Sequence, residues 1–271
     1  MDSNFQTIKT RQERRLRWIV LNTPKTKNAF DRQQWLDVLQ ALTDAEDDES
    51  VGCVALRGAG GNFSAGYDFP AAMEKMKDRS VESIRDHIAP GNEVCWKIWN
   101  FKKPMIAAIE GYCLGGAFEM AMACDFVVAE RSSSFGEPEA RIGTAAPFLI
   151  TPWVAGLRYA KELLLTGRIV SAARAEHMGL VNELCEPGKI EDCVHAWASQ
   201  LTAFSGGSWH RNKMSVNRAY EIMGFNTAIA LGEDAFVETV LSTDKFKKEL
   251  AERIARDGFS SALGWVKNRF G

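Results

Sequence analysis

Short apolar runs alternate with helical patterns over the first 130 residues, and this alternation constrains the fold more than any other feature. Strands are predicted for the runs Leu16–Leu21, Val51–Arg57, Met105–Glu110 and Phe126–Ala129. Stretches with apolar residues at helical spacing separate them. Strands separated by helices of this length favour a parallel, layered α/β arrangement.

The helices between these strands have recognisable starts and ends. Asp31 stands at an N-cap position, and Gln34 follows three residues later as in a capping box. A long helix is predicted over Val81–Asn100, with the turn out of it at Pro104, and a short apolar helix over Ala117–Ala123.

The character of the sequence changes after about Leu149. Only Val181–Leu184 has the pattern of a strand there. The predicted helices are Val154–Leu165, Ala172–Met178, Ile190–Ala203, Lys213–Met223, Ala228–Leu241 and Lys245–Arg256. The residues alone therefore predict an α/β core followed by a helical tail, with no linker between them.

Charge and composition exclude several classes of protein. The 271 residues include 33 Lys and Arg against 35 Asp and Glu, so the chain lacks the basic excess of a nucleic-acid-binding protein. No apolar run approaches the roughly 18 residues that cross a bilayer, and the start has no apolar stretch like that of a signal peptide. The six cysteines are scattered and fit reduced thiols. We expect a cytoplasmic protein without nucleic-acid or membrane partners.

Several familiar sites are missing from the sequence. Phe63 stands where the third glycine of a GxGxxG dinucleotide motif belongs, and neither a GxxxxGK[ST] phosphate loop nor a GxSxG hydrolase motif occurs. The histidines form no metal-ligand pattern and lie far apart at His87, His177, His195 and His210. The sequence therefore predicts neither a metal site nor a nicotinamide site.

Two glycine-bearing segments remain as candidates for chemistry, Phe63–Asp68 and Gly111–Glu119. Glycines let the backbone approach a ligand, and the first N–H groups of a helix have no partner within it. One N–H group from each segment would stabilise negative charge that develops on a carbonyl oxygen. The loss of one such donor typically raises a reaction barrier by ~3–4 kcal/mol.

Two glutamates accompany these segments. Glu119 lies in an apolar stretch, where burial would raise its pKa and equip it to move protons near neutral pH. Glu139 is the second, and Glu137 is expected to point elsewhere if this segment is extended. Taken one at a time, these features fit two surface acids and two ordinary glycine turns equally well.

Together and in this order, the segments resemble the crotonase family, also called the enoyl-CoA hydratase/isomerase superfamily. The strings FSAGYD, GYCLGGAFE and FGEPE carry the resemblance. It extends over nearly the whole chain through Pro24–Phe30, Cys124-Asp125, Phe135–Gly143, Leu163–Gly167 and Ala172–Val181.

The resemblance implies a crotonase-like α/β spiral of ββα units over residues 1–200. A helical C-terminal region over 201–271 would pack subunits into homotrimers, often paired as hexamers. Carried over by position, the oxyanion hole is formed by the N–H groups of Tyr67 and Gly116, and Glu119 and Glu139 are the catalytic acids. The resemblance places coenzyme A near Lys27, Ala65, Asp68 and Phe69.

The family's chemistry narrows the reaction that these residues imply. Family hydratases use two carboxylates, so the resemblance favours addition of water to a trans-2-enoyl-CoA, which gives a 3-hydroxyacyl-CoA. No metal or redox cofactor is expected, because coenzyme A arrives as part of the substrate. The alternatives are a double-bond isomerase that relies on Glu139 alone, a hydrolase of a C–C or thioester bond, and a non-catalytic binding protein.

The sequence departs from the hydratase pattern in two places. Ala145–Trp153 replaces a glycine-rich stretch that lines the water site, and Phe148 and Trp153 are expected to reshape or stiffen that wall. Tyr67 replaces a small residue, so its hydroxyl either enters the acyl space or the ring merely packs in the wall. Lys267 and Phe270 are candidates for C-terminal contacts with coenzyme A.

Overall fold

The computed structural model describes residues 5–75, 78–203 and 208–270, and the side chains of the same residues except 73–75 and 270. The main sheet has six strands in the order β1-β2-β3-β4-β6-β9. Its strands are β1 (Ile8–Glu13), β2 (Leu16–Leu21), β3 (Cys53–Gly58), β4 (Met105–Ile109), β6 (Phe126–Glu130) and β9 (Glu183–Cys185). All neighbours are parallel except β1 and β2, which confirms the predicted strands and the parallel core.

A second, smaller sheet has the order β5-β7-β8. Its strands are β5 (Tyr112–Leu114), β7 (Ser134–Gly136) and β8 (Val170–Ser171). Isolated bridges between Ser64 and Cys113 and between Phe30 and Tyr67 join the earlier loops to this layer. Each turn of the chain therefore adds one strand to the main sheet and a short strand or bridge beside it. This is the ββα spiral that the resemblance implied.

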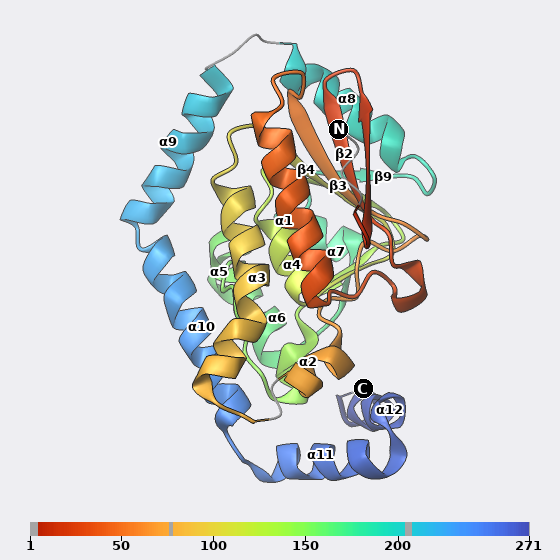
Figure 1. Cartoon of the computed structure of the whole chain (residues 1–271), viewed down its shortest axis with the longest axis vertical. Helices are drawn as coiled ribbons and strands as arrows, with labels where there is room; N and C mark the ends of the chain where they lie inside the picture. The colour runs from red at the N-terminus through yellow and green to blue at the C-terminus, as the bar shows by residue number, and fades with distance from the viewer. Residues whose placement is uncertain (1–4, 76–77, 204–207, 271) are drawn as a thin grey trace.

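Helices cover both faces of the main sheet (Figure 1). On one face Ile19 and Leu21 of β2 pack with α1 (Arg32–Asp47), α3 (Val81–Trp99) and α4 (Gly116–Met122). On the other face Leu16 and Trp18 pack against α8 (Ile190–Thr202). Successive residues of a strand point to opposite faces, so one apolar strand serves both layers.

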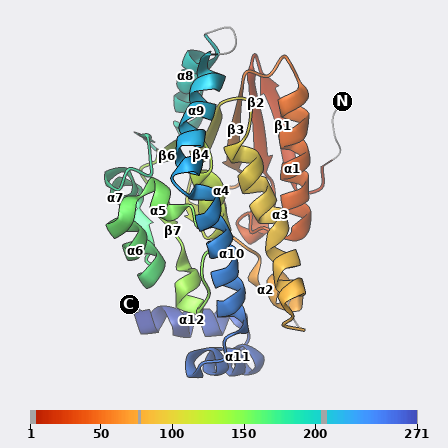
Figure 2. The same cartoon turned by 90° about the vertical axis from the view of Figure 1, so that its left-hand side faces the viewer.

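Four helices follow α8 in the described chain. They are α9 (Ser208–Ile222), α10 (Phe225–Leu241), α11 (Lys245–Asp257) and α12 (Phe259–Phe270). Figure 2 shows α9 and α10 running one after the other along the molecule, with α11 and α12 at its end. Phe236 and Val237 of α10 pack on Ile84 and Ile88 of α3. The helical C-terminal region is thus confirmed, whereas its role in assembly and its boundary near residue 200 stay predictions.

The remaining elements are short. They are η1 (Pro24–Thr26), α2 (Phe69–Lys75), η2 (Pro138–Ile142), α5 (Thr151–Val154), α6 (Gly156–Thr166) and α7 (Ala172–His177). The helix predicted over Val154–Leu165 is two helices, because Gly156 has a φ of 70° at their junction. No helix in the described ranges has the length and apolarity needed to cross a bilayer. All six cysteines are free.

Candidate active site

The two glycine segments meet beside the carboxyl end of β4. Ser64 N–H donates to Tyr112 O at 2.8 Å, and Leu114 N–H donates back to Ser64 O at 3.2 Å. A Cβ on Gly66 would lie only 2.6 Å from Leu114 O, so no other residue fits between the segments without a shift. The structure therefore brings together two segments that lie far apart in the sequence.

The predicted oxyanion-hole donors both have unoccupied N–H groups. Gly116 is the first residue of α4, where an N–H group has no partner within the helix. Tyr67 lies between two residues that pair with Phe30, because Phe30 N–H donates to Gly66 O and Asp68 N–H donates to Phe30 O. Within the described residues, neither the Tyr67 nor the Gly116 N–H group donates to a protein acceptor.

The ring of Tyr67 fills the space between α4 and α3. A Cβ on Gly116 would overlap the ring edge, and a Cβ on Gly91 would lie 2.5 Å from the Tyr67 hydroxyl oxygen. Trp35 and His87 flank the ring, with centroids 5.6 and 5.5 Å from it. Sequence reasoning missed Gly91, although a glycine directly after Pro90 inside a long helix is a signal that a side chain is excluded there.

Tyr67 is partly buried, and its hydroxyl lies near enough to acidic groups for their charges to act on it. Burial, followed by the negative charge of Glu119, raises the pKa of this hydroxyl well above its ordinary value. No described residue forms a hydrogen bond with it. Of the two readings of Tyr67, packing in the wall therefore applies to the ring, and the hydroxyl lies against Gly91 of α3.

Glu119 lies on α4, one turn after Gly116, and is 2% exposed. Its Oε1 accepts a hydrogen bond from Phe148 N–H at 2.8 Å. Burial, together with the negative charges of Glu137 and Glu139, raises the pKa of Glu119 well above its ordinary value. This is the shift that sequence reasoning expected for this carboxyl.

Glu139 lies in η2 and faces the turn that leads into α4. A Cβ on Gly115 would overlap Glu139 Oε1, so the carboxyl lies directly against the residue before Gly116. Its Oε2 is buried and has no partner among the described residues. Burial raises the pKa of Glu139 to about 7. Glu139 thus lies against the turn into α4 and interacts electrostatically with Glu119 on that helix.

Glu137 does not point elsewhere, and that prediction is wrong. It is 1% exposed, and the Thr151 hydroxyl donates a hydrogen bond to its Oε1. Burial and the charge of Glu139 raise its pKa to about 8. The expectation assumed an extended segment, but the chain enters the 3₁₀ helix η2 directly after Glu137, which turns both glutamates toward the interior. Sequence reasoning had no signal for Thr151.

The departure at 145–153 forms an aromatic anchor. Phe148 is fully buried and packs edge-on against Trp96 of α3, with ring centroids 5.5 Å apart. Trp153 lies 5.5 Å from Phe225 and 6.0 Å from Tyr220. These contacts fix the loop that presents Phe148 N–H to Glu119, in line with the stiffening expected from the sequence.

The predicted coenzyme A contacts lie along the segments before and after Tyr67. Ala65 N–H donates to Lys27 O at 3.0 Å, and the Lys27 amine lies 4.7 Å from the Tyr112 ring. Asp68 accepts a hydrogen bond from Ala71 N–H at the start of α2. Phe69 stacks on Phe259 of α12 at 4.6 Å. Lys267 is exposed on α12, and the Phe270 side chain lies outside the described residues.

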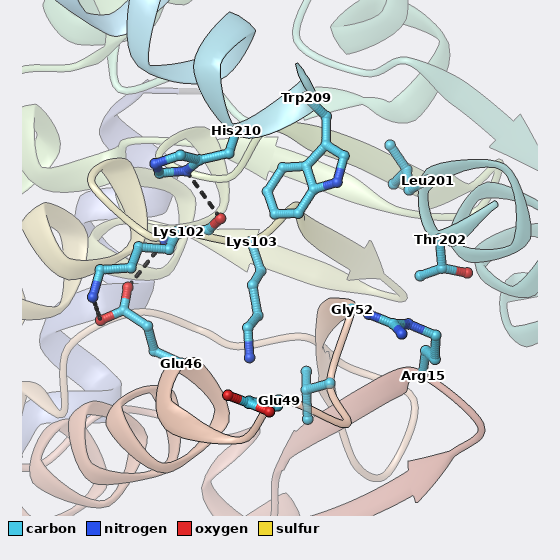
Figure 3. A pocket seen from close by; sticks show the side chains of 11 residues that line it. Arg15, Glu46, Glu49, Gly52, Lys102, Lys103, Leu201, Thr202, Trp209 and His210 are labelled. Carbon is cyan, nitrogen blue, oxygen red and sulfur yellow. Dashed lines mark hydrogen bonds and ion pairs between the residues drawn. The ribbon is translucent and has the colours of Figure 1, made fainter. Parts of the chain in front are cut away.

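A pocket of about 360 Å³ lies near the amino ends of β3 and β4, away from the two glycine segments (Figure 3). It is lined by Arg15, Glu46, Glu49, Val51, Gly52, Lys102, Lys103, Leu201, Thr202, Trp209 and His210. The Lys103 amine donates to the carbonyl oxygens of Ala45 and Asp48 at the end of α1. Parallel α/β sheets bind ligands at the carboxyl ends of their strands, and this pocket lies at the amino ends. It contains none of the predicted site residues.

One group of potential metal ligands occurs among the described residues, formed by Glu13, Glu191 and His195. Arg11 forms ion pairs with both carboxylates, and Arg57 pairs with Glu191. These charges are therefore balanced by arginine, and the group lies away from Glu119 and Glu139 in the sequence and the fold.

Comparisons with known proteins show the family to which the chain belongs. Residues 11–255 match the model of the family described as enoyl-CoA hydratase/isomerase. The chain belongs to this family. The resemblance noted in the sequence is thereby confirmed, and the chain is an enzyme of the enoyl-CoA hydratase type.

Three relatives show how far the similarity extends. A crotonyl-CoA hydratase of Syntrophomonas wolfei is 30% identical over 86% of this chain and 89% of its own. A mevalonyl-coenzyme A hydratase of Beauveria bassiana is 35% identical over 70% of this chain and 71% of its own. The crystal structure of an enoyl-CoA hydratase/isomerase from Xanthobacter autotrophicus Py2 covers 99% of this chain and 100% of its own, at 31% identity and a TM-score of 0.93.

Proposed function

We propose that this enzyme adds water across the double bond of a trans-2-enoyl-CoA and releases a 3-hydroxyacyl-CoA. The proposal is supported by two carboxyls with raised pKa values, Glu119 and Glu139, near the N–H groups of Tyr67 and Gly116, which have no acceptor among the described residues.

The two N–H groups would hold the thioester carbonyl oxygen. Addition of water forms a bond from its oxygen to C3 and gives C2 a proton, and negative charge develops on the carbonyl oxygen between these events. Donors aimed at that oxygen stabilise the transition state more than the ground state. The thioester itself supplies the electron sink, so we propose that the reaction uses no metal or redox cofactor.

The carboxyls would carry the protons. One of them, ionised, accepts a proton from the attacking water, and the other, protonated, delivers a proton to C2. This division needs one ionised and one protonated group at the same pH. Raised pKa values of both Glu119 and Glu139 support it, because they place the ionisation of the pair near neutrality.

We further propose that Lys27, Ala65, Asp68 and Phe69 contact coenzyme A. We also propose that residues 201–271 assemble the enzyme into a cytoplasmic homotrimer or dimer of trimers. The name of the Syntrophomonas relative, a crotonyl-CoA hydratase, supports a short enoyl-CoA as the first substrate to test.

Glutamine variants of the two carboxyls test the mechanism. Glu119→Gln and Glu139→Gln are each expected to lower the kcat of hydration by at least about 100-fold, since each removes a proton-transfer group. Glu130→Gln is the matched control, because Glu130 is another buried glutamate, 7% exposed, on β6. Loss of hydration in Glu139→Gln alone, with near-normal hydration by Glu119→Gln, would contradict the two-carboxylate mechanism.

Mass spectrometry of the products separates the alternatives. The purified enzyme is incubated with short, long, cyclic and aromatic enoyl-CoAs. A gain of one water supports the hydratase, conversion without a mass change supports an isomerase, and free coenzyme A supports a thioesterase. Tight acyl-CoA binding with no turnover across the panel would indicate a binding protein instead.

A further inference from the structure

Glu137 is as buried as Glu119 but has no part in the reaction described above. It is 1% exposed, and Thr151 donates to one of its carboxyl oxygens. The other oxygen, Oε2, is buried and has no partner among the described residues. A carboxyl in such a place is costly to ionise, so its presence needs an explanation.

The three glutamates form one electrostatic group. Glu137 immediately precedes η2, Glu139 lies within it, and Glu119 interacts with both from α4. Among the described side chains, no lysine, arginine or histidine pairs with any of the three. The Tyr67 hydroxyl and the Cys95 thiol also interact with Glu119, and both are neutral because burial raises their pKa values. Like charges this close, without a cation, do not all ionise near neutral pH.

We propose that Glu137 is a positioning residue that keeps one proton on the Glu119–Glu139 pair at mildly alkaline pH. The inference rests on the proposed hydratase function, which needs that proton for delivery to C2. When Glu137 ionises, its negative charge makes removal of the last proton from the pair more costly.

The charge of Glu137 is expected to affect the alkaline side of the pH profile and not the acid side. Burial raises the pKa of Glu139 to about 7, and burial together with the charge of Glu139 raises that of Glu137 to about 8. The charges of Glu137 and Glu139 both raise the pKa of Glu119 further, so the charge of Glu137 acts on the last proton of the pair. Only the alkaline limit of activity should depend on it.

The hydrogen bond from Thr151 also connects Glu137 to the loop that carries Phe148. Thr151 is the first residue of α5, and Phe148, three residues earlier, donates its N–H group to Glu119. A glutamine at 137 keeps an oxygen for Thr151 and removes only the charge. The substitution therefore separates the electrostatic role from the anchoring of the loop.

The pH profile of kcat/KM for hydration of crotonyl-CoA tests the proposal, because it reports the ionisations of the free enzyme. In Glu137→Gln the alkaline limb is expected to move to lower pH by about one pH unit, while the acid limb stays in place. Glu130→Gln, at a buried glutamate that accepts from Gly188 N–H at 2.7 Å, should move neither limb. An unmoved alkaline limb in Glu137→Gln, or an equal shift in Glu130→Gln, overturns the proposal.

A measurement without substrate checks the buried proton independently. Glu137 ionises near pH 4.5 in the unfolded chain and near 8 in the folded protein, so it lowers stability progressively as the pH rises between these values. Glu137→Gln should therefore raise the thermal midpoint relative to the wild type by several degrees more at pH 8.5 than at pH 5.5. A constant difference overturns the proposal. The wild type could hydrate no enoyl-CoA while the difference in thermal midpoint still grows with pH. That result would contradict the hydratase function but support a proton held by the three glutamates.

Discussion

Tyr67 serves two purposes with different parts of the same residue. Its N–H group belongs to the proposed oxyanion hole, and its ring fills the space between Gly116 and Gly91. The carbonyl of a bound thioester would lie at the N–H group, so the ring would stand beside the acyl chain. On this proposal the residue would link catalysis to the size of the acyl group.

Tyr67→Ala is expected to shift the preference of the enzyme toward longer acyl chains. The ratio of kcat/KM for trans-2-octenoyl-CoA to that for crotonyl-CoA should rise about tenfold, the gain from apolar contacts worth about 1.4 kcal/mol. Tyr67→Phe, which keeps the ring, should leave this ratio close to that of the wild type. The same ratio in the alanine variant and the wild type would show that the ring does not limit the chain.

Gly116→Ala is expected to lower kcat by about 100- to 1000-fold, comparable to the loss of one oxyanion-hole donor. The added Cβ would overlap the ring of Tyr67, so either the ring or the N–H group must move. Steady-state kinetics with crotonyl-CoA provide the measurement. Gly264→Ala is the control, because a Cβ on this residue of α12 meets no atom within 4 Å. Equal kinetics for both variants would contradict the role of Gly116.

At the scale of elements, the segment from η2 to α5 holds the carboxyls. Thr151→Val would leave Glu137 Oε1 without its donor and free the loop that ends at α5. We expect it to lower the free energy of unfolding by about 1–3 kcal/mol, the usual effect of an unpaired buried acceptor, and to lower kcat with it. Urea denaturation gives the first quantity and kinetics the second.

Thr202→Val is the matched control, because the Thr202 hydroxyl only bonds within α8, to Ala198 O at 2.7 Å. Its expected change in unfolding free energy is within about 0.5 kcal/mol, as for a substitution away from the core. A larger loss at 202 than at 151 would contradict the anchoring role of Thr151.

Elements with an apolar run or a helical period were predictable from the sequence, whereas the polar edge strand and several two- or three-residue strands were not. Strands β2, β3, β4 and β6 lie within two residues of the predicted ranges. Strand β1 was missed because an edge strand of sequence IKTRQE needs few apolar residues. Strands β5, β7 and β8 have only two or three residues, too few to show a period, and α12 was not foreseen.

The candidate site was predictable where it depends on local sequence. The glycine segments and Glu119 could be found because glycines and an acid in an apolar stretch are visible in one window. The inward turn of Glu137 depends on η2, and the contact of Gly91 with Tyr67 depends on the packing of α3 against the loop after β3. Such tertiary contacts leave no periodic signal in one sequence.

At the scale of the whole molecule, a partly buried ion pair joins the C-terminal helices to the core. Lys213 of α9 lies 2.9 Å from Asp125, whose carboxylate also accepts Met105 N–H at the start of β4. Burial raises the pKa of Asp125 although Lys213 opposes this. The pair therefore joins a late helix to two strands of the main sheet.

Lys213→Met is expected to lower the free energy of unfolding by about 2–3 kcal/mol, because it leaves a largely buried carboxylate without its cation. The loss should be smaller at pH 4 than at pH 8, since protonation removes the unpaired charge as the pH falls. Urea denaturation at the two pH values measures both effects. Lys189→Met, at an exposed pair with Asp192, should cost less than about 1 kcal/mol. Equal losses for the two variants would contradict the attachment through Asp125.

The absence of a side chain at Gly91 restricts the order in which this protein can change. A larger residue at position 91 would clash with the tyrosine at position 67, since even a methyl group would come within 2.5 Å of the phenol oxygen. Shortening residue 67 first removes the conflict, whereas enlarging residue 91 first creates it. If the enzyme is changed to accept a different acyl group, the substitution at position 67 in the loop must therefore come before any substitution at position 91 in α3.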